Sequence, residues 1–237
     1  MFNIYVISPL RSDGKTFISA GIAATMQSLG YKTAIFKPFQ LGGIEKNGFI
    51  QSKDVTFIKS LDPYINTKLS YVFKTDEEPL IASEIENEPI NTDLILKEFQ
   101  KIASASECTI IDGSSGLLSP ICAEIQTADL IKQLQIPVLI VTKPNKDAVN
   151  STLQTIYTAQ EKGLLVRGVI INDIKENDKN LITSLSRIIE EYTSVKVLGL
   201  VSHLKDCNAP EEIISSVLNG IDIESVFNVK IEKLELG

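Results

Sequence analysis

The tripeptide Gly14-Lys15-Thr16 lies between an apolar run, residues 4–7, and an amphipathic stretch, residues 17–29. The three segments indicate a strand, a phosphate-binding loop and a helix. Backbone N–H groups of such a loop, with the helix N-terminus, attract phosphate oxygens. Lys15 would reach the β- and γ-phosphates, and the Thr16 hydroxyl would hold Mg²⁺. The usual motif has a glycine five residues before Gly14, where this chain has a proline, so an ordinary turn with a capping glycine is the alternative.

Three further polar residues stand next to apolar runs. Lys37 ends the second strand-like run, Asp54 opens a short helix after a glycine-containing loop, and Asp112 ends the third run. A carboxylate after a strand, followed by small residues, is where phosphate-loop enzymes hold a metal. We expect Lys37 to lie beside the phosphate loop if the first two strands are neighbours. Taken singly, each residue also fits an ordinary role: a solvated lysine, a helix N-cap or a turn.

Runs rich in Val and Ile alternate with helical patterns along the chain. Continuous apolar runs are typical of parallel strands that are buried on both faces. The sequence therefore predicts a doubly wound α/β fold, a mostly parallel sheet with helices on both faces, and ligands beyond the carboxyl ends of the strands. The predicted strands are residues 2–7, 33–37, 109–112, 138–142, 168–172 and 195–201, and the predicted helices are residues 16–29, 92–105, 123–134, 147–162, 179–192 and 210–218.

Composition narrows the class of protein. The 237 residues are 43% hydrophobic and 22% charged, which suits a single domain over residues 1–237. A net charge of −7 without a Lys/Arg cluster argues against nucleic acid or an anionic membrane as a partner. The chain shows no leader-like start and no long apolar run, so we expect a cytosolic protein. Cys108, Cys122 and Cys207 are then expected to be unpaired thiols.

The chain has one histidine, His203, which follows the apolar run at residues 197–201. A Ser-His-Asp triad and a His-rich zinc site are therefore nearly excluded. Proton transfers would fall to lysine, to carboxylates or to the substrate itself. We expect His203 to be a strand-end residue with a satisfied ring, and the alternative is a stacking contact with a base.

The order of these residues resembles that of the ATP-dependent dethiobiotin synthetase family over residues 1 to about 204. The family's deviant phosphate loop, Gly-Thr-Asp-Thr-x-Val-Gly-Lys-Thr, corresponds to residues 8–16, of which the last three match. Its Lys-Pro-x-x-Ser/Thr-Gly corresponds to residues 37–42, and its next aspartate to Asp54. Its Glu-Gly-Ala-Gly-Gly corresponds to residues 112–116.

The resemblance continues in the second half of the chain. The family's Pro-Val-Ile-Leu-Val strand is similar to residues 137–141, its interface asparagine to Asn150, and its Ala-Asn-Asp segment to residues 171–173. Residues 221–237 would form a C-terminal extension of unknown structure, and the weakly alternating end of the chain allows no placement.

The resemblance implies a phosphate-loop NTPase-like fold and a Mg²⁺-dependent ligase in a cytoplasmic homodimer. Such a ligase joins CO₂ to the diamine 7,8-diaminononanoate and closes a cyclic urea at the expense of ATP, through a carbamate and a carbamic-phosphoric anhydride. It implies that Lys15 and Lys37 are catalytic, that ATP is bound by Ser12, Asp13, Gly14, Lys15, Thr16, Phe17 and Asn172, that the metal is held by Thr16, Asp54 and Asp112, and that the substrate contacts Arg11, Lys37, Leu41 and Asn150.

Four positions near the expected substrate depart from the family pattern. Arg11 replaces a threonine, Leu41 a serine or threonine, Glu78 a serine, and Asp147 a glycine. Glu78 and Asp147 add negative charge where the nonanoate carboxylate is expected, and Arg11 would offset it with a bidentate grip. Two alternatives therefore stay open: a related ATPase or ligase acting on another amine or carboxylate, and a nucleotide-dependent dimeric switch without diamine activity.

Overall fold

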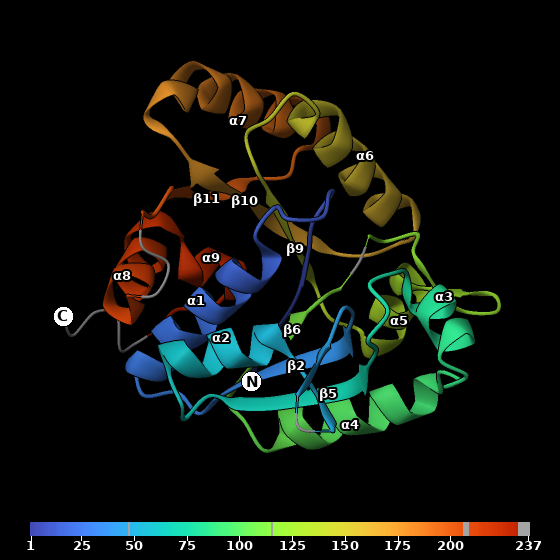
Figure 1. The fold of residues 1–237 in the computed structure, drawn as a ribbon. Helices are drawn as coiled ribbons and strands as arrows, with labels where there is room; N and C mark the ends of the chain where they lie inside the picture. The colour runs from blue at the N-terminus through green and yellow to red at the C-terminus, as the bar shows by residue number, and fades with distance from the viewer. Residues whose placement is uncertain (47, 115, 206–208, 232–237) are drawn as a thin grey trace.

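The computed structural model describes residues 1–46, 48–114, 116–205 and 209–231, and its centre is a seven-stranded sheet (Figure 1). Every neighbouring pair in this sheet is parallel, so all seven strands direct their carboxyl ends to one edge, as the sequence predicts. The strands are β1 (Phe2–Ile7), β2 (Thr33–Gln40), β5 (Asn66–Val72), β6 (Cys108–Asp112), β9 (Val138–Thr142), β10 (Val166–Ile174) and β11 (Val197–Ser202). Their order across the sheet is β11-β10-β9-β1-β6-β2-β5.

Helices cover both faces of the sheet (Figure 1). Strand side chains alternate between two buried clusters, so that Tyr5 and Ile7 face one and Ile4 and Val6 face the other. The first cluster is closed by α3 (Pro79–Ile85), α4 (Thr92–Ser104), α5 (Thr127–Leu134), α6 (Ala148–Glu161) and α7 (Lys179–Thr193), the last preceded by the short 3₁₀ helix η1 (Glu176–Asp178). The second cluster is closed by α1 (Lys15–Ser28), α2 (Lys53–Leu61), α8 (Pro210–Gly220) and α9 (Ile223–Phe227). The doubly wound fold is therefore confirmed.

The connection from β1 to α1 has the shape that the sequence predicts. β1 ends at Ile7 and α1 begins at Lys15, so residues 8–14 form a loop at the carboxyl edge of the sheet. Gly14 caps α1 with a φ of +93°, in the left-handed region that favours glycine. A Cβ on Gly14 would lie 2.0 Å from Nδ2 of Asn172, so only glycine allows these two segments to come this close.

The sheet order corrects one expectation about Lys37. β1 and β2 are not neighbours, because β6 pairs with both of them and lies between them. Lys37 still approaches the loop, because its side chain extends to Asp112 at the end of β6. The strand β5 was not predicted, because it lies at the sheet edge and most of its residues are only half-buried. The hairpin of β3 (Ile44–Lys46) and β4 (Phe49–Gln51) was not predicted either.

The start of one predicted helix was wrong. The helix predicted over residues 123–134 begins at Thr127, and the residues before it form a hairpin of β7 (Pro120–Cys122) and β8 (Ile125–Gln126). The hairpin turns at Glu124, which has a φ of +66°. The Asp129 carboxylate accepts the N–H of Gln126 at 2.9 Å, which begins the helix only there. The other predicted helices and strands agree with the structure within a few residues.

The C-terminal helices complete the second buried cluster. Residues of α8 and α9 pack in this cluster with α1, and Ile231 is fully buried there. Cys108 and Cys122 are free thiols, whereas Cys207, Ser115 and residues 232–237 lie outside the described residues. In the described part of the chain, no helix has the length and apolar character that crossing a membrane requires.

Candidate nucleotide and metal site

The loop of residues 8–14 is held in shape by its own polar groups. The Ser8 hydroxyl donates to the Leu10 carbonyl at 2.6 Å, and the Leu10 N–H donates to the Asp13 carboxylate at 3.0 Å. Burial raises the pKa of Asp13, even though the Leu10 N–H and nearby lysines act against it. Ser12 and Gly14 both have positive φ, which turns the backbone into the first turn of α1. A loop of this form at a helix N-terminus presents N–H groups to an anion.

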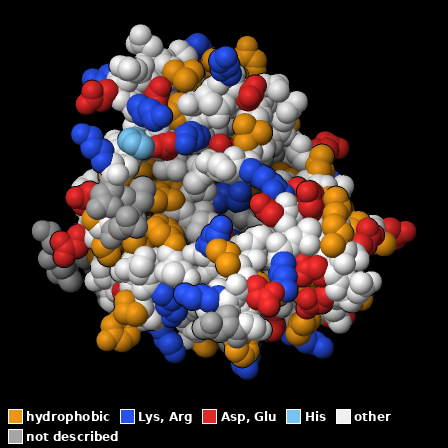
Figure 2. All heavy atoms as spheres, viewed as in Figure 1, with side chains coloured by type: hydrophobic (Ala, Val, Ile, Leu, Met, Phe, Trp, Pro, Cys, Tyr) orange, Lys and Arg blue, Asp and Glu red, His pale blue; other side chains and the backbone are white. Residues whose placement is uncertain are grey.

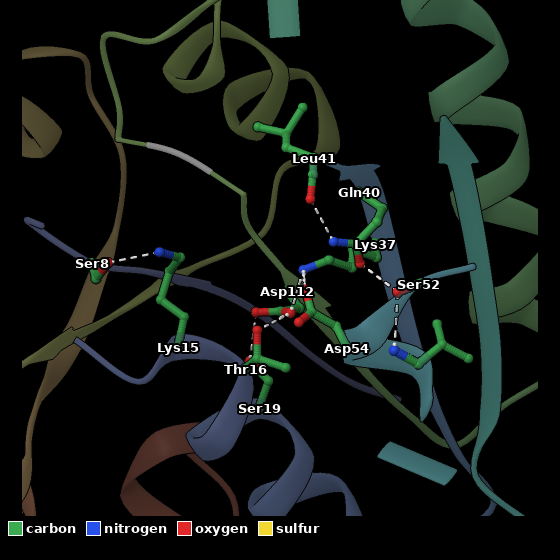
Figure 3. A network of polar contacts seen from close by, with 11 residues as sticks. Ser8, Lys15, Thr16, Ser19, Lys37, Gln40, Leu41, Ser52, Asp54 and Asp112 are labelled. Atoms are coloured by element: carbon green, nitrogen blue, oxygen red, sulfur yellow. Dashed lines mark hydrogen bonds and ion pairs between the residues drawn. The ribbon is translucent and has the colours of Figure 1, made fainter. Parts of the chain in front are cut away.

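Lys15 follows the loop and points across it (Figure 3). Its Nζ donates to the Ser8 hydroxyl at 2.8 Å. Burial lowers the pKa of Lys15, and the charge of Lys37 lowers it further, while Asp112 acts in the opposite direction. The ammonium is therefore a partly desolvated cation at the loop, which suits contact with a phosphate oxygen.

Asp112 is the centre of a cluster of polar side chains (Figure 3). It ends β6 and is fully buried, and its carboxylate accepts from the Thr16 hydroxyl at 2.8 Å and the Ser19 hydroxyl at 3.3 Å. Lys37 Nζ lies 2.7 Å from Asp112 Oδ2 and 2.8 Å from Asp54 Oδ2. Three segments distant in the chain, β2, the start of α2 and the end of β6, therefore meet beside the first turn of α1.

The oxygen atoms of this cluster fit a magnesium ion. Thr16 supplies a hydroxyl, and Asp54 and Asp112 supply carboxylates, all hard donors of the kind that Mg²⁺ prefers. Within the described ranges, no cluster of three or more His, Cys, Asp or Glu side chains could hold a metal. A metal here would therefore need phosphate or water oxygens as additional ligands, which is the usual way in which Mg²⁺ is bound beside a nucleotide.

Lys37 is the most deeply buried lysine of the site, with 4% of its surface exposed. Burial by itself would lower the pKa of Lys37, but Asp112 and Asp54 together outweigh burial and hold the pKa above its usual value. The side chain is therefore an ammonium at neutral pH. It has three N–H donors, two of which face these carboxylates, and it also lines a cavity of about 230 Å³ with Arg11.

Ser52 and Gln40, which were not singled out in the sequence, fix the position of Asp54 at the start of α2. Ser52 caps α2 by accepting the N–H of Val55 at 3.0 Å, and its hydroxyl also donates to the side chain of Gln40. Gln40 in turn donates to the Leu41 carbonyl at 2.8 Å. The start of α2 is thereby joined to the end of β2. A serine two residues before Asp54 was a usable N-cap signal.

Arg11 and Glu78 belong to a second group of charged side chains beside the loop. Arg11 Nη1 lies 3.3 Å from both the carbonyl and the carboxylate of Asp76, and its Nη2 lies 3.9 Å from Glu78. The Glu78 carboxylate also accepts a hydrogen bond from Ser119. Arg11 and Glu78 line a second cavity of about 440 Å³, together with Lys15 and polar residues of α6. Asp76 and Ser119 were not singled out in the sequence.

The structure brings most of the predicted site residues together, but not all of them. The smaller cavity and the loop are surrounded by residues 11–16, Lys37, Leu41, Asp54 and Asp112. Asn172 is nearly buried, and its Nδ2 donates to the carbonyl of Asp13 at 3.0 Å. By contrast, the Phe17 ring packs on Phe57 of α2, with 6.3 Å between centroids. Asn150 is exposed on α6, and Asp147 is exposed at the start of that helix.

His203 lies where the sequence predicts, directly after β11. Its Nδ1 lies 2.5 Å from the Asp173 carboxylate, so the ring is satisfied. Figure 2 shows the histidine at the upper left of this face, and Lys and Arg side chains around a hollow in the middle of the face. The positive side chains therefore gather locally on a chain whose net charge is −7.

Comparison with known proteins gives concordant matches. The profile of a family described as AAA domain matches residues 3–211. ATP-dependent dethiobiotin synthetase BioD of Nitrosopumilus maritimus (strain SCM1) is 32% identical over 213 residues, covering 87% of this chain and 91% of that protein. The protein of the same name from Clostridium acetobutylicum (strain ATCC 824) is 30% identical, covering 87% of this chain and 88% of that protein.

Solved structures share the fold at low sequence identity. A chain of the MinC:MinD cell division protein complex of Aquifex aeolicus superposes with a TM-score of 0.62 at 13% identity, covering 100% of this chain and 96% of that one. A ParA family ATPase from Chlorobium tepidum TLS gives a TM-score of 0.56 at 17% identity, covering 97% of this chain and 94% of that one. The chain therefore shares its doubly wound fold with these two proteins.

Proposed function

Since the chain belongs to the family of ATP-dependent dethiobiotin synthetases, which are ligases of biotin synthesis, we propose that it joins CO₂ to 7,8-diaminononanoate and closes the cyclic urea of dethiobiotin. The observation that carries this proposal is the Lys37 ammonium, which is buried between Asp54 and Asp112 and also lines the cavity beside the phosphate loop. Nucleotide binding alone does not need a second lysine at this place. A reaction that passes through an anion does.

The first step makes a carbamate. A neutral amine nitrogen of the substrate attacks the carbon of CO₂, an N–C bond forms, and an amine proton leaves to solvent. The product is an anion in a water-poor cavity, where a nearby cation stabilises it more than it would in water. Two N–H donors of Lys37 face carboxylates at 2.7 and 2.8 Å, and we assign the third to the carbamate.

The second step transfers a phosphoryl group. A carbamate oxygen attacks the γ-phosphorus of ATP, the bond from this phosphorus to the β,γ-bridging oxygen breaks, and ADP leaves. Little covalent chemistry is asked of the protein, because positioning and charge neutralisation dominate such reactions. The loop N–H groups and Lys15 would hold the phosphates. Thr16, Asp54 and Asp112 would hold Mg²⁺, which neutralises phosphate charge when it is bound.

The third step closes the ring. The second amine, in its neutral form, attacks the carbonyl carbon of the carbamic-phosphoric anhydride, an N–C bond forms, the C–O bond to phosphate breaks, inorganic phosphate leaves, and the amine proton is released to solvent. Lys37 lines the cavity in which these groups would react, so its position supports a role throughout. Orienting both amines at one end of the cavity is the main requirement for this intramolecular attack.

The remaining assignments follow the family pattern. Asn172, which lies at the end of β10 and contacts the loop, would also contact the adenine, as the family pattern implies. Asn150 is exposed on α6, so it is accessible to a second copy of the chain, in keeping with the homodimer that the family pattern implies. We propose a cytoplasmic location because the substrates are small soluble metabolites.

Two variants test the proposal. Lys37→Ala should leave Mg-ATP affinity nearly unchanged in calorimetry and abolish phosphate release that depends on both diaminononanoate and bicarbonate. The expected loss is about 2 to 4 kcal/mol of transition-state stabilisation, the scale of one electrostatic donor. Lys74→Ala is a matched control, because this lysine pairs with Glu45 on the surface. If Lys37→Ala instead destroys ATP binding, the lysine belongs to the phosphate site and a plain ATPase becomes the better assignment.

A second candidate function is a related ligase for another amine, and one observation favours it. The larger cavity contains Arg11 and Glu78, a cation and an anion, where the family has two uncharged residues. A substrate with both charges at its distal end would be matched by such a pair. Parallel thermal-shift measurements with Mg-ATP, bicarbonate, and either diaminononanoate or a shorter diamine carrying an amino-acid end distinguish the two candidates.

A further inference from the structure

A β-bulge interrupts the end of β10 beside the phosphate loop. Ile171 pairs with Leu200 of β11 and Ile174 pairs with Ser202, so two residues of β10 lie opposite one of β11. The two residues are Asn172 and Asp173. Asp173 has a φ of +60°, a left-handed conformation that is uncommon outside glycine and is tolerated best by Asn and Asp. Bulges of this kind redirect a side chain and often lie next to functional sites.

The strained residue is held by side chains from both neighbouring strands. The Asp173 carboxylate contacts Nδ1 of His203 at 2.5 Å with one oxygen and Nζ of Lys143 with the other. His203 comes directly after β11, and Lys143 comes directly after β9. Burial would raise the pKa of Asp173, but the two partners outweigh burial and lower it. A conformation that costs free energy persists where its surroundings hold it, and these contacts supply that support.

The bulge directs Asn172 at the phosphate loop. The Asn172 side chain is 5% exposed, and its Nδ2 donates to the Asp13 carbonyl at 3.0 Å. The same nitrogen lies against Gly14, where a Cβ would be only 2.0 Å away. The carbonyl of Asp13 is thereby turned toward Asn172. The Gly14 N–H belongs to the same trans peptide unit as this carbonyl and therefore points the opposite way, to the side on which an anion would bind.

We propose that Asp173, Lys143 and His203 are positioning residues that hold the Asn172 bulge, and through it hold Asp13 and Gly14 of the phosphate loop in the binding conformation. None of the three needs to contact the nucleotide for this role. The effect should therefore be felt by any triphosphate, whatever is attached to it. The inference rests on phosphate binding by the loop and not on the diamine reaction, so failure of the ligase assignment would leave it standing.

The sharpest test is Asp173→Asn. Asparagine keeps the shape and tolerates positive φ, but it removes the charge that holds Lys143 and His203. Simple electrostatics predicts that loss of a negative charge near the loop tightens triphosphate binding. The positioning role predicts the opposite sign, a loss of about fivefold, at the lower end of typical couplings between sites. The control is Glu191→Gln, which breaks a surface pair with Arg187 on α7.

Affinities for ATP and for inorganic tripolyphosphate are measured by calorimetry, and hydrogen exchange of residues 8–16 is measured without ligand. We expect Asp173→Asn to weaken both ligands, ATP at least as much as tripolyphosphate because Asn172 would also contact the adenine, and to speed exchange in the loop, while the control changes neither. A loss confined to ATP would place the cluster on the base or ribose and overturn the proposal. Unchanged or tighter binding of tripolyphosphate would also overturn it.

A second variant covers the case in which Asp173→Asn folds poorly. His203→Gln removes the imidazole, one of the two side chains that contact the Asp173 carboxylate, and leaves Asp173 and Lys143 in place. We expect a smaller loss for both ligands and faster exchange in residues 8–16. In the double variant, the losses should not add, because both residues act through one bulge. Full additivity would show independent effects and would contradict the proposal.

Discussion

Asp112 is fully buried and its carboxylate faces the ammonium of Lys37, a residue with 4% of its surface exposed. Replacing Asp112 by asparagine removes the negative charge of this pair. Removing one partner of a buried ion pair costs about 3 to 5 kcal/mol, because the other charge is left uncompensated. Here Asp54 still lies 2.8 Å from Lys37, so we take the lower end, about 3 kcal/mol. Typical domains have about 5 to 15 kcal/mol of stability, so the variant should fold and its loss should be measurable.

Urea unfolding at neutral pH measures this loss, and Asp54→Asn is the matched control. Asp54 is 29% exposed, so water screens its charge and the expected cost is at most about 1 kcal/mol. Lys37→Met combined with Asp112→Asn should cost clearly less than the sum of the two single changes, because no fully buried charge is left uncompensated and the remaining Asp54 carboxylate is screened by water. Equal losses for Asp112→Asn and Asp54→Asn, or full additivity in the double variant, would refute the buried-pair reasoning.

The same variant has a pH dependence with a defined sign. In the wild type the pKa of Lys37 is raised above its usual value of 10.5, so the stabilisation by its charge is complete at neutral pH and is lost only as pH rises through the raised pKa. In Asp112→Asn, burial is opposed by Asp54 alone and the pKa of Lys37 should fall below that of the unfolded chain. The unfolded state then binds more protons, so the variant should gain stability as the pH rises from neutral toward the pKa of an unfolded lysine, about 10.4. A parallel pH profile in both proteins would contradict this.

Three further predictions concern the loop and its neighbours. Lys15→Ala should lose most ATP affinity in calorimetry without lowering the melting temperature of the ligand-free protein, because burial lowers the pKa of this lysine and makes its charge unfavourable there. Gly14→Ala should lower the melting temperature and weaken ATP binding, since φ is +93° and the new Cβ would meet Asn172; about 1 to 3 kcal/mol is expected from the backbone alone. The ion pairs of Asp173 should stabilise the protein above about pH 4, and this stabilisation should be lost as the pH falls through the lowered pKa of Asp173. In acid unfolding, Asp173→Asn should therefore lose less stability than the wild type.

Much of the site was predictable because its residues lie next to buried strands. Lys15 and Thr16 follow β1, and Asp112 ends β6, so the apolar runs placed them at one edge of a parallel sheet. Lys37 was predicted for a partly wrong reason, because β6 and not β1 is its strand neighbour. Asn150 is exposed, so a single chain does not show which group its side chain would contact.

Other residues carried no sequence signal. Asp76 and Ser119 lie in connecting segments, and they contact Arg11 and Glu78 only because β5 and β6 end near the loop. The strand β5 itself lacks a continuous buried run, since it lies at the sheet edge. Hydrophobic periodicity detects elements with a buried face, and it says nothing about polar contacts between loops.

The sequence by itself determined the alternation of strands and helices and the loop around Gly14, because each depends on residues close together in the chain. The class of chemistry came from a resemblance to a family over residues 1 to about 204. The strand order, the meeting of Lys37 with Asp54 and Asp112, and the bulge that turns Asn172 toward Asp13 were decided only by the tertiary structure. The physical reason is the separation along the chain of the residues that interact. Local patterns set backbone propensity and burial, whereas the partners of a buried charge or amide depend on which strands become neighbours, and this is settled by packing across the whole sheet.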